Sequence, residues 1–213
     1  MGQVIYLHER RPVRIGAIRQ DRPTFFFDVS SPLSYLMAER IERTLGEVTW
    51  VAADGSLLRR ARNGRDRGQT LQGLRGRAEA AARAMRLPLV WPERFPGSAP
   101  CAQRAAAFAC EIGAGAAFAL AASRLAFCGG FDLEDPETLA EAAAAAGVPL
   151  EGCLAAAGET WRDEELTATV RQLADNGVTE VPAIRVGRRW TEGEQGLLTA
   201  QLLLHEAGAD RAC

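Results

Sequence analysis

A short polar segment directly after an apolar run is the first place in this sequence that could do chemistry. Ser31, Pro32 and Ser34 follow the run Thr24–Val29, and apolar residues at helical spacing come next. Serine favours the N-cap position and proline the first helical position, so we expect a helix to begin here. The free amides of such a start favour an anion, and a serine hydroxyl can donate to sulfur. The segment therefore indicates either an ordinary helix cap or a site that stabilises the thiolate of a bound molecule.

Cysteine is absent from this segment, which excludes one kind of reaction. Redox proteins often place a Cys-x-x-Cys pair at a helix start, whereas Ser31–Ser34 has no cysteine and cannot form a local disulfide. The cysteines of the chain are odd in number, widely spaced and without a Cys-x-x-Cys pair, which predicts reduced, buried thiols. They are Cys101, Cys110, Cys128, Cys153 and Cys213.

A proline inside a strand-like run is the second unusual feature. Pro182 interrupts Glu180–Ile184, an otherwise strand-like stretch. Proline cannot donate to a strand ladder, so its presence indicates an edge strand, a bulge or a cis peptide bond. An edge strand with an ordinary trans proline is the alternative that requires no function.

The elements that must position these residues follow an α/β order. Strand patterns cover 24–29 and 48–53, and a helical pattern joins them and ends at Gly46. The Arg-rich stretch 57–77 has no steady period and reads as a loop or a frayed segment. Helical character returns at 76–86, and helices then dominate from 101 to about 174. Two short strands and a last helix complete the chain. Because the strands on both sides of the helical block must share one sheet, we predict a thioredoxin-like α/β fold with an inserted all-helical domain. We expect an N-terminal extension at 1–22, a thioredoxin-like domain at 23–58 and 172–213, and the helical insertion at 59–171.

Composition and charge limit the classes of partner that we expect for this protein. The formal net charge is -2, and the seven arginines between Arg59 and Arg77 have no interleaved aromatic residues, so we expect no nucleic acid partner. Neither a secretory apolar region nor a membrane-spanning run is present, so we expect a cytoplasmic protein with no membrane partner.

Several stretches together resemble a known family. The stretch 25–42 (FFFDVSSPLSYLMAERIE) is similar to the active-site opening of 2-hydroxychromene-2-carboxylate isomerases and kappa-class glutathione transferases, which belong to the DsbA-like branch of the thioredoxin fold. The stretches 76–96, 102–113 and 176–198 resemble the helix, the following helix and the cis-proline strand with the last helix of these proteins. The resemblance covers roughly residues 24 to 205 in the same order.

The resemblance implies glutathione, or another low-molecular-weight thiol, as cofactor or cosubstrate, and no metal. It places Ser31 against the sulfur, and Val181, before a cis Pro182, against the cysteinyl backbone. The family's carboxylate at the start of the last helix corresponds to Glu194 and Gln195, shifted by one position or lost. The family's loop asparagine has its nearest counterpart in Asn63, without the usual proline after it.

These features favour a thiol-dependent isomerase that acts on a small unsaturated or aromatic acid. A kappa-class-like glutathione transferase and a degenerate, non-catalytic thioredoxin-like binding protein stay open as alternatives. An oxidoreductase that uses Cys101 and Cys110 is a further hypothesis, although no pattern brings either thiol to the helix start. Relatives of this kind often dimerise, so a homodimer also stays open.

Overall fold

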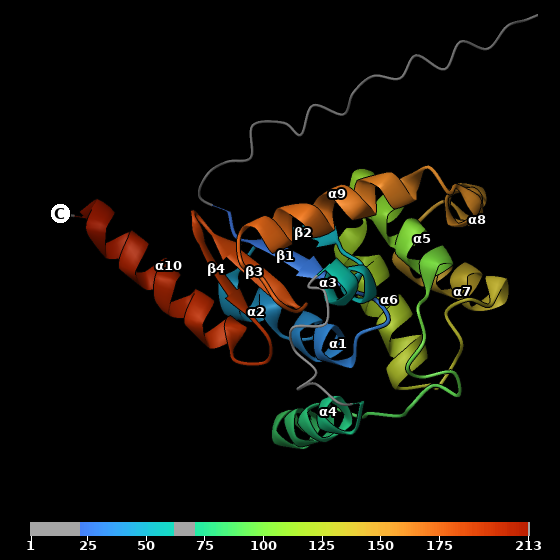
Figure 1. Ribbon diagram of the computed structural model, residues 1–213, viewed down its shortest axis with the longest axis horizontal. Helices are drawn as coiled ribbons and strands as arrows, with labels where there is room; N and C mark the ends of the chain where they lie inside the picture. The colour runs from blue at the N-terminus through green and yellow to red at the C-terminus, as the bar shows by residue number, and fades with distance from the viewer. Residues whose placement is uncertain (1–21, 62–70, 213) are drawn as a thin grey trace, which may run out of the picture.

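A four-stranded mixed sheet forms the centre of the fold. The computed structural model describes residues 22–61 and 71–212. Its sheet has the order β2-β1-β3-β4, in which β2 runs parallel to β1 while β3 is antiparallel to both β1 and β4 (Figure 1). The strands are β1 (Thr24–Phe27), β2 (Thr49–Ala52), β3 (Ala183–Val186) and β4 (Arg189–Glu192).

A block of helices separates the first strand pair from the second. In Figure 1, α5 to α8 lie beyond one end of the sheet, α9 crosses above it and α10 lies at the opposite side. This order confirms the predicted α/β fold with a helical insertion between two parts of one sheet. The helices are α1 (Pro32–Ala38), α2 (Ile41–Leu45), α3 (Gly55–Ala61), α4 (Leu71–Met85), α5 (Pro100–Glu111), α6 (Gly115–Phe127), α7 (Pro136–Ala146), α8 (Leu150–Gly158), α9 (Arg162–Asp175) and α10 (Gly196–Ala212).

Helices cover both faces of the sheet, and β1 is therefore buried along its whole length. Successive strand residues point to opposite faces. Phe25 and Phe27 belong to the larger hydrophobic core, which also contains residues of α1, α5, α6 and α10. Phe26 points to a smaller core, where Leu58 of α3 and Leu173 of α9 meet it. A continuous apolar run is the pattern that such a doubly covered strand requires.

Two predictions about the helices are wrong. The helix that starts after Ser31 is interrupted at Glu39 and Arg40, and α2 continues the chain as a separate turn. The predicted loop 57–77 is helical wherever the structure describes it, in α3 and in the first half of α4. Arginine is a good helix former, and Leu58 of α3 is fully buried, so tertiary packing overrides the missing period.

The predicted domain boundaries stay a prediction. The boundary between residues 171 and 172 falls inside α9, where Val170 and Leu173 both join the small core around Phe26. The expected N-terminal extension 1–22 lies outside the described residues except for Arg22. No described helix is both long enough and apolar enough to cross a membrane.

Candidate functional site

One edge of the sheet collects the residues that the sequence singled out. β1 and β2 run parallel and end at this edge, while the antiparallel β3 begins there and β4 ends there. The segments that follow Phe27 and Glu192 therefore meet the segment that precedes Ala183. This topology brings Ser31, Pro182 and Glu194 together from distant parts of the chain.

Ser31 caps α1 as the sequence predicts. Its backbone is extended, its Oγ accepts a hydrogen bond from the Ser34 amide at 3.3 Å, and Pro32 occupies the first turn. The Ser31 amide donates to the Asp28 carbonyl at 3.0 Å, and the Asp28 amide donates to the Ser34 Oγ at 3.1 Å. The cap uses one lone pair of the Ser31 hydroxyl and leaves its proton available to a ligand.

Val181 presents its backbone at the same edge. The Val181–Pro182 peptide bond is cis, as the resemblance implied. The Pro182 carbonyl accepts a hydrogen bond from the Gly193 amide at 2.9 Å. Val181 is buried, yet within residues 22–61 and 71–212 no partner meets its amide or its carbonyl. Because buried backbone groups are nearly always paired, this amide and carbonyl are suited to an extended ligand.

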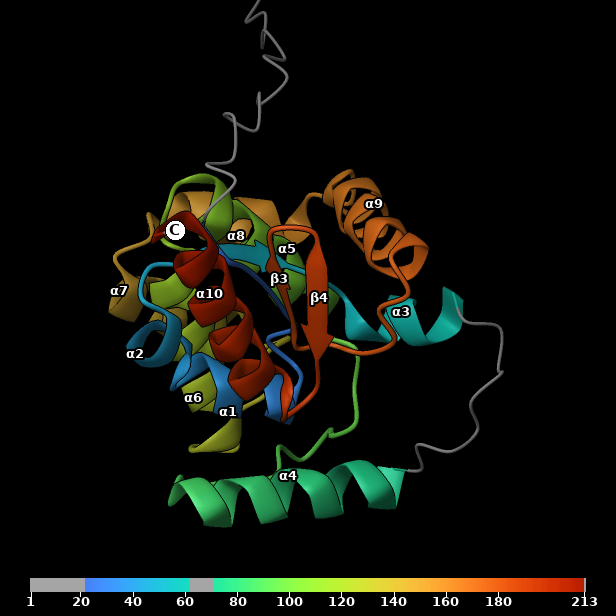
Figure 2. The same cartoon turned by 90° about the vertical axis from the view of Figure 1, so that its left-hand side faces the viewer.

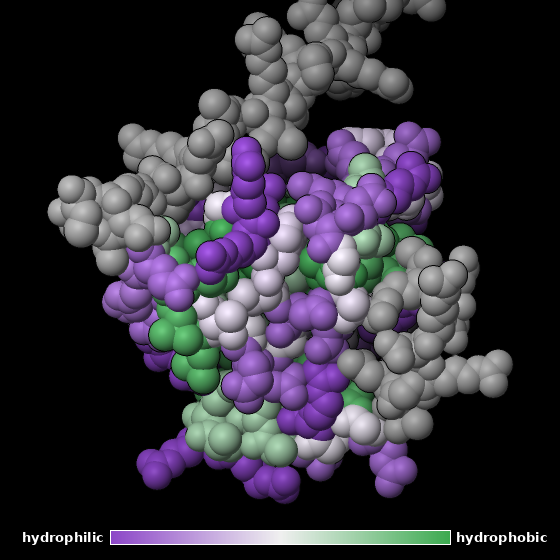
Figure 3. All heavy atoms as spheres, turned by 60° about the vertical axis from the view of Figure 1, so that its left-hand side comes forward, coloured by the Kyte–Doolittle hydropathy of each residue, from purple (hydrophilic) through white to green (hydrophobic). Residues whose placement is uncertain are grey.

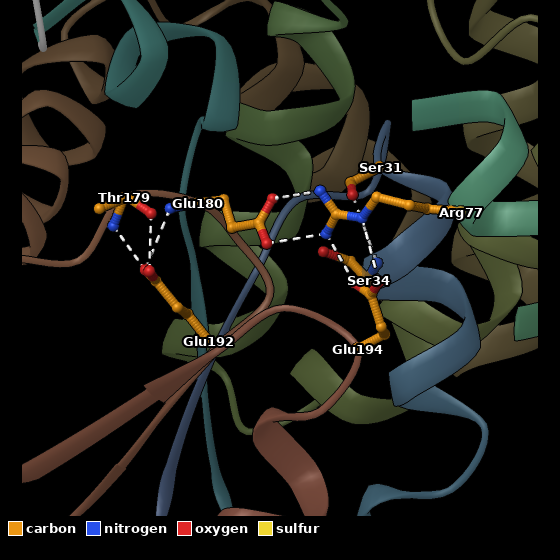
Figure 4. Close-up of polar contacts among 7 residues, drawn as sticks. All are labelled: Ser31, Ser34, Arg77, Thr179, Glu180, Glu192 and Glu194. Atoms are coloured by element: carbon orange, nitrogen blue, oxygen red, sulfur yellow. Dashed lines mark hydrogen bonds and ion pairs between the residues drawn. The ribbon is translucent and has the colours of Figure 1, made fainter. Parts of the chain in front are cut away.

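Glu192 fixes the segment before Val181. Its carboxylate accepts hydrogen bonds from the Thr179 amide, from the Thr179 hydroxyl at 2.6 Å and from the Glu180 amide at 3.2 Å. Figure 4 shows this carboxylate facing both amides. Glu192 is therefore a positioning residue for the Val181 backbone, and the sequence reasoning missed it.

Arg77 of α4 joins two carboxylates at this edge. Its guanidinium group lies 2.8 Å from a Glu180 oxygen and 2.6 Å from a Glu194 oxygen (Figure 4). Both contacts are two-point pairs, a geometry that suits guanidinium and carboxylate. The hydrogen bonds from Arg77 lower the pKa of Glu194. Arg77 thus connects α4 to two glutamates that lie more than a hundred positions later in the chain, and the three side chains form one side of the site.

Asp28 is a fully buried carboxyl group below the site. Its oxygens accept hydrogen bonds from the Ser30 amide at 2.7 Å, the Ser30 hydroxyl at 2.6 Å and the Gly55 amide at 2.9 Å, and also from Gln103. Burial raises the pKa of Asp28. The Gln103 Oε1 is buried without a partner among the described residues. Asp28 holds the end of β1, the cap loop and the start of α3 together.

Cys101 and Cys110 are unsuited to redox chemistry at this site. Burial raises the pKa of Cys101, and it raises the pKa of Cys110 to about 12. Both lie on α5, nine residues apart, which places them on opposite sides of the helix and about 13 Å apart along its axis. They cannot form a disulfide with each other in this helix.

The remaining site predictions have mixed outcomes. Gln195 is exposed at the start of α10 and shares a pocket with Glu194 and Leu33. Asn63 lies outside the described residues. Glu180 and Asp28 were not predicted, and Arg77 was noted only as one of the seven arginines of the Arg-rich stretch. Asp28 carried a signal, as a carboxylate at the end of an apolar strand. Among the described residues, no group of three or more His, Cys, Asp or Glu side chains could hold a metal ion.

Comparisons with solved structures agree with this architecture. A 2-hydroxychromene-2-carboxylate isomerase superposes with a TM-score of 0.76 at 16% identity, over 89% of this chain and 97% of that chain. A probable DsbA oxidoreductase from Streptomyces coelicolor gives 0.70 at 24% identity, over 88% and 90%. A candidate protein disulfide isomerase from Nitrosomonas europaea gives 0.66 at 15% identity, over 90% and 99%. At these identities the likeness concerns the fold.

The family of the chain follows from a sequence comparison. No curated protein matches the chain. The family model of the DsbA-like thioredoxin domain matches residues 24–204, which includes the Ser31 cap, the helical insertion and the Val181–Pro182 segment. The chain therefore belongs to the DsbA-like thioredoxin domain family.

Proposed function

We propose that the chain is a thiol-dependent isomerase that acts on a small unsaturated or aromatic acid. Glutathione is the first candidate for the thiol. The observation that carries the proposal is the buried Val181 backbone, which lacks partners among the described residues at the same sheet edge as the Ser31 hydroxyl. The absence of cysteine from Ser31–Ser34 favours isomerisation over dithiol exchange.

The residues at this edge fit the cysteinyl part of a peptide-like thiol. The Val181 amide and carbonyl would pair with the backbone of the ligand in the manner of an added strand. The Ser31 hydroxyl would donate to its sulfur, which favours the ionised form and lowers the pKa of the thiol. When bound, such a thiol supplies a nucleophile that adds to a conjugated acid and leaves again after bond rotation. Glu192 keeps the Val181 backbone in place through Thr179 and Glu180.

Glu194 supports a second candidate, a binding protein without catalysis. The resemblance implies that a carboxylate at this position meets the ammonium group of the γ-glutamyl unit of glutathione. Arg77 already holds the Glu194 carboxylate in a two-point pair. A ligand ammonium would have to share this carboxylate with Arg77. A binding protein needs only the Val181 groove, whereas an isomerase also needs the Ser31 hydroxyl against a thiolate.

Calorimetry and thiolate absorbance test the proposal. We expect glutathione to bind the wild-type protein, and the ultraviolet absorbance of its thiolate to persist to a lower pH than in free glutathione. Ser31→Ala should raise the pKa of the bound thiol by about one unit, because one hydrogen bond to the charged form is lost. It should also slow isomerisation of 2-hydroxychromene-2-carboxylate by at least about tenfold.

Ser98 provides a matched control, because it is an exposed serine in the loop before α5. Ser98→Ala should leave both measurements unchanged. Glutathione binding with the same thiol pKa in wild type and Ser31→Ala would contradict the isomerase and favour the binding protein. A complete lack of thiol binding would contradict both.

A further inference from the structure

A pocket of about 670 Å³ lies along the side of α1, away from the cap. Its walls come from α1, from Arg40 before α2 and Arg43 within it, from α4 and the nearby Leu87, and from the start of α10. The volume is within the range of ordinary ligand pockets. Neither Ser31 nor Val181 lines it, although Glu194 and Gln195 do. The pocket is therefore a neighbour of the thiol groove rather than part of it.

The walls of the pocket are mostly apolar. α1 contributes Leu36 and Met37, α4 contributes Met85, and α10 contributes Leu197 and Leu198. The side of α4 that faces the pocket carries alanines 80, 81 and 84, whose short side chains fill little of the space between the helices. Figure 2 shows α4 set apart from the body of the fold below α1. This arrangement leaves room for an apolar body, which the leucine and methionine side chains would cover.

The charged groups of the pocket favour an anion. Arg40 lines the pocket, is only partly exposed, and has no ion pair or side-chain hydrogen bond among the described residues. Arg43 also lines the pocket and donates to the Glu39 carbonyl. Arg77 is paired with Glu180 and Glu194, and Glu194 is the one carboxylate among the described residues of the wall.

Among the residues that the structure describes, neighbouring elements supply no partner for the Arg40 guanidinium. The Glu39 carboxylate beside it is held by Arg124 of α6 in a two-point pair at 2.6 and 2.8 Å. Figure 3 shows the face that carries α4 and α10, where hydrophobic surface alternates with hydrophilic surface. A guanidinium that has no partner among the described residues, in the wall of a mostly apolar pocket, complements one carboxylate attached to an apolar group.

We infer that this pocket is a second small-molecule site, which binds a monocarboxylate with an apolar body. Arg40 pairs with the carboxylate, and the side chains of Leu36, Met37, Met85 and Leu198 surround the apolar part. From Leu33 to Arg40 the chain advances about 10 Å at helical rise. The wall along α1 therefore matches the length of a bicyclic or medium-chain acid. The site does not depend on thiol binding at Ser31.

Calorimetry with 2-naphthoate and its neutral amide, 2-naphthamide, tests this inference without any thiol. We expect 2-naphthoate to bind the wild-type protein at least about tenfold more tightly than the amide, because a charge-assisted pair is lost in the amide. Arg40→Gln should weaken 2-naphthoate binding by about the same factor and leave the amide unchanged. Arg83→Gln, an exposed position on α4 outside the pocket, should change neither.

Two further variants locate the ligand. Ala84→Leu places a larger side chain in the pocket wall and should weaken both probes, whereas Ser31→Ala should weaken glutathione binding only. The inference is overturned if 2-naphthoate does not bind. That result is expected if another part of the chain fills the pocket. It is also overturned if acid and amide bind equally, if Arg40→Gln or Ala84→Leu has no effect, or if Ser31→Ala weakens 2-naphthoate as Arg40→Gln does.

Discussion

The two ends of α1 are built in different ways. At its start, Ser31 faces a site made mostly of backbone groups, whose positions follow from the sheet register and from the Ser31 cap. Beyond its end, Arg40 borders a pocket whose walls are side chains of α1, α2, α4 and α10 and of the segments beside them. The first end depends on strand pairing and buried hydrogen bonds, and the second depends on the placement of α4. Substitutions should therefore separate the two sites.

Gly55→Ala should have the largest effect on stability, and it should disturb only the site at the Ser31 end of α1. A Cβ atom at this position would lie 2.8 Å from the Val181 Cγ2 and 2.9 Å from the Asp28 Oδ2. We expect Gly55→Ala to lower the free energy of unfolding by roughly 1–3 kcal/mol, as overpacking does, and to weaken glutathione binding. Binding of 2-naphthoate by the folded protein should persist. Denaturant titration and calorimetry measure both.

Gly76 is the matched control, because a Cβ atom there meets nothing within 4 Å. Gly76→Ala lies inside α4 and should raise the free energy of unfolding by about 0.5–1 kcal/mol. An equal loss of stability in both variants would mean that crowding at Val181 is not the cause.

Arg77 links the two ends, so Arg77→Gln should affect both. The variant leaves Glu180 and Glu194 without their shared cation, and we expect a loss of about 1–2 kcal/mol at neutral pH for this partly exposed group. Arg77 lowers the pKa of Glu194, so its contribution is present above the ordinary glutamate pKa and is lost as pH falls through the lowered value. Denaturant midpoints of wild type and variant should converge in acid, and a constant difference would contradict this account.

Asp28→Asn should change the pH dependence of the free energy of unfolding more than it changes that free energy at any single pH. Burial raises its pKa, so the unfolded chain releases this proton at a lower pH than the folded chain does. As pH rises from the pKa of the unfolded chain to the pKa of the folded chain, the free energy of unfolding should fall, by at most about 1.4 kcal/mol per pH unit. Asp28→Asn removes this slope in urea titrations across the acidic range. An unaltered slope would show that Asp28 does not titrate there.

Substitution of the cysteines on α5 should have the smallest effect on ligand binding at either end of α1. The thiols of Cys101 and Cys110 have raised pKa values and lie on opposite sides of α5. A Cys101→Ala, Cys110→Ala double variant should therefore bind glutathione and 2-naphthoate like the wild type and retain isomerase activity. Loss of activity with unchanged binding would instead support the oxidoreductase hypothesis.

Patterns within short stretches predicted much of the fold. The apolar run of β1 and the Ser31 cap with Pro32 are both present where the sequence indicated them. The Arg-rich stretch was misread, because Leu58 supports α3 through a core contact and Ala78 and Ala82 supply the buried side of α4. Such contacts leave little periodicity in the sequence.

By itself the sequence determined the strands, the caps, the order of elements and two of the residues at the sheet edge, Ser31 and Pro182. These depend on preferences of the backbone over a few neighbouring residues, which composition and spacing express directly. Only the tertiary structure decided that Arg77 joins Glu180 to Glu194, that Glu192 holds the segment before Val181, and that Arg40 borders a pocket. Those pairs come from elements far apart in the chain, and their distances follow from how whole helices and strands pack.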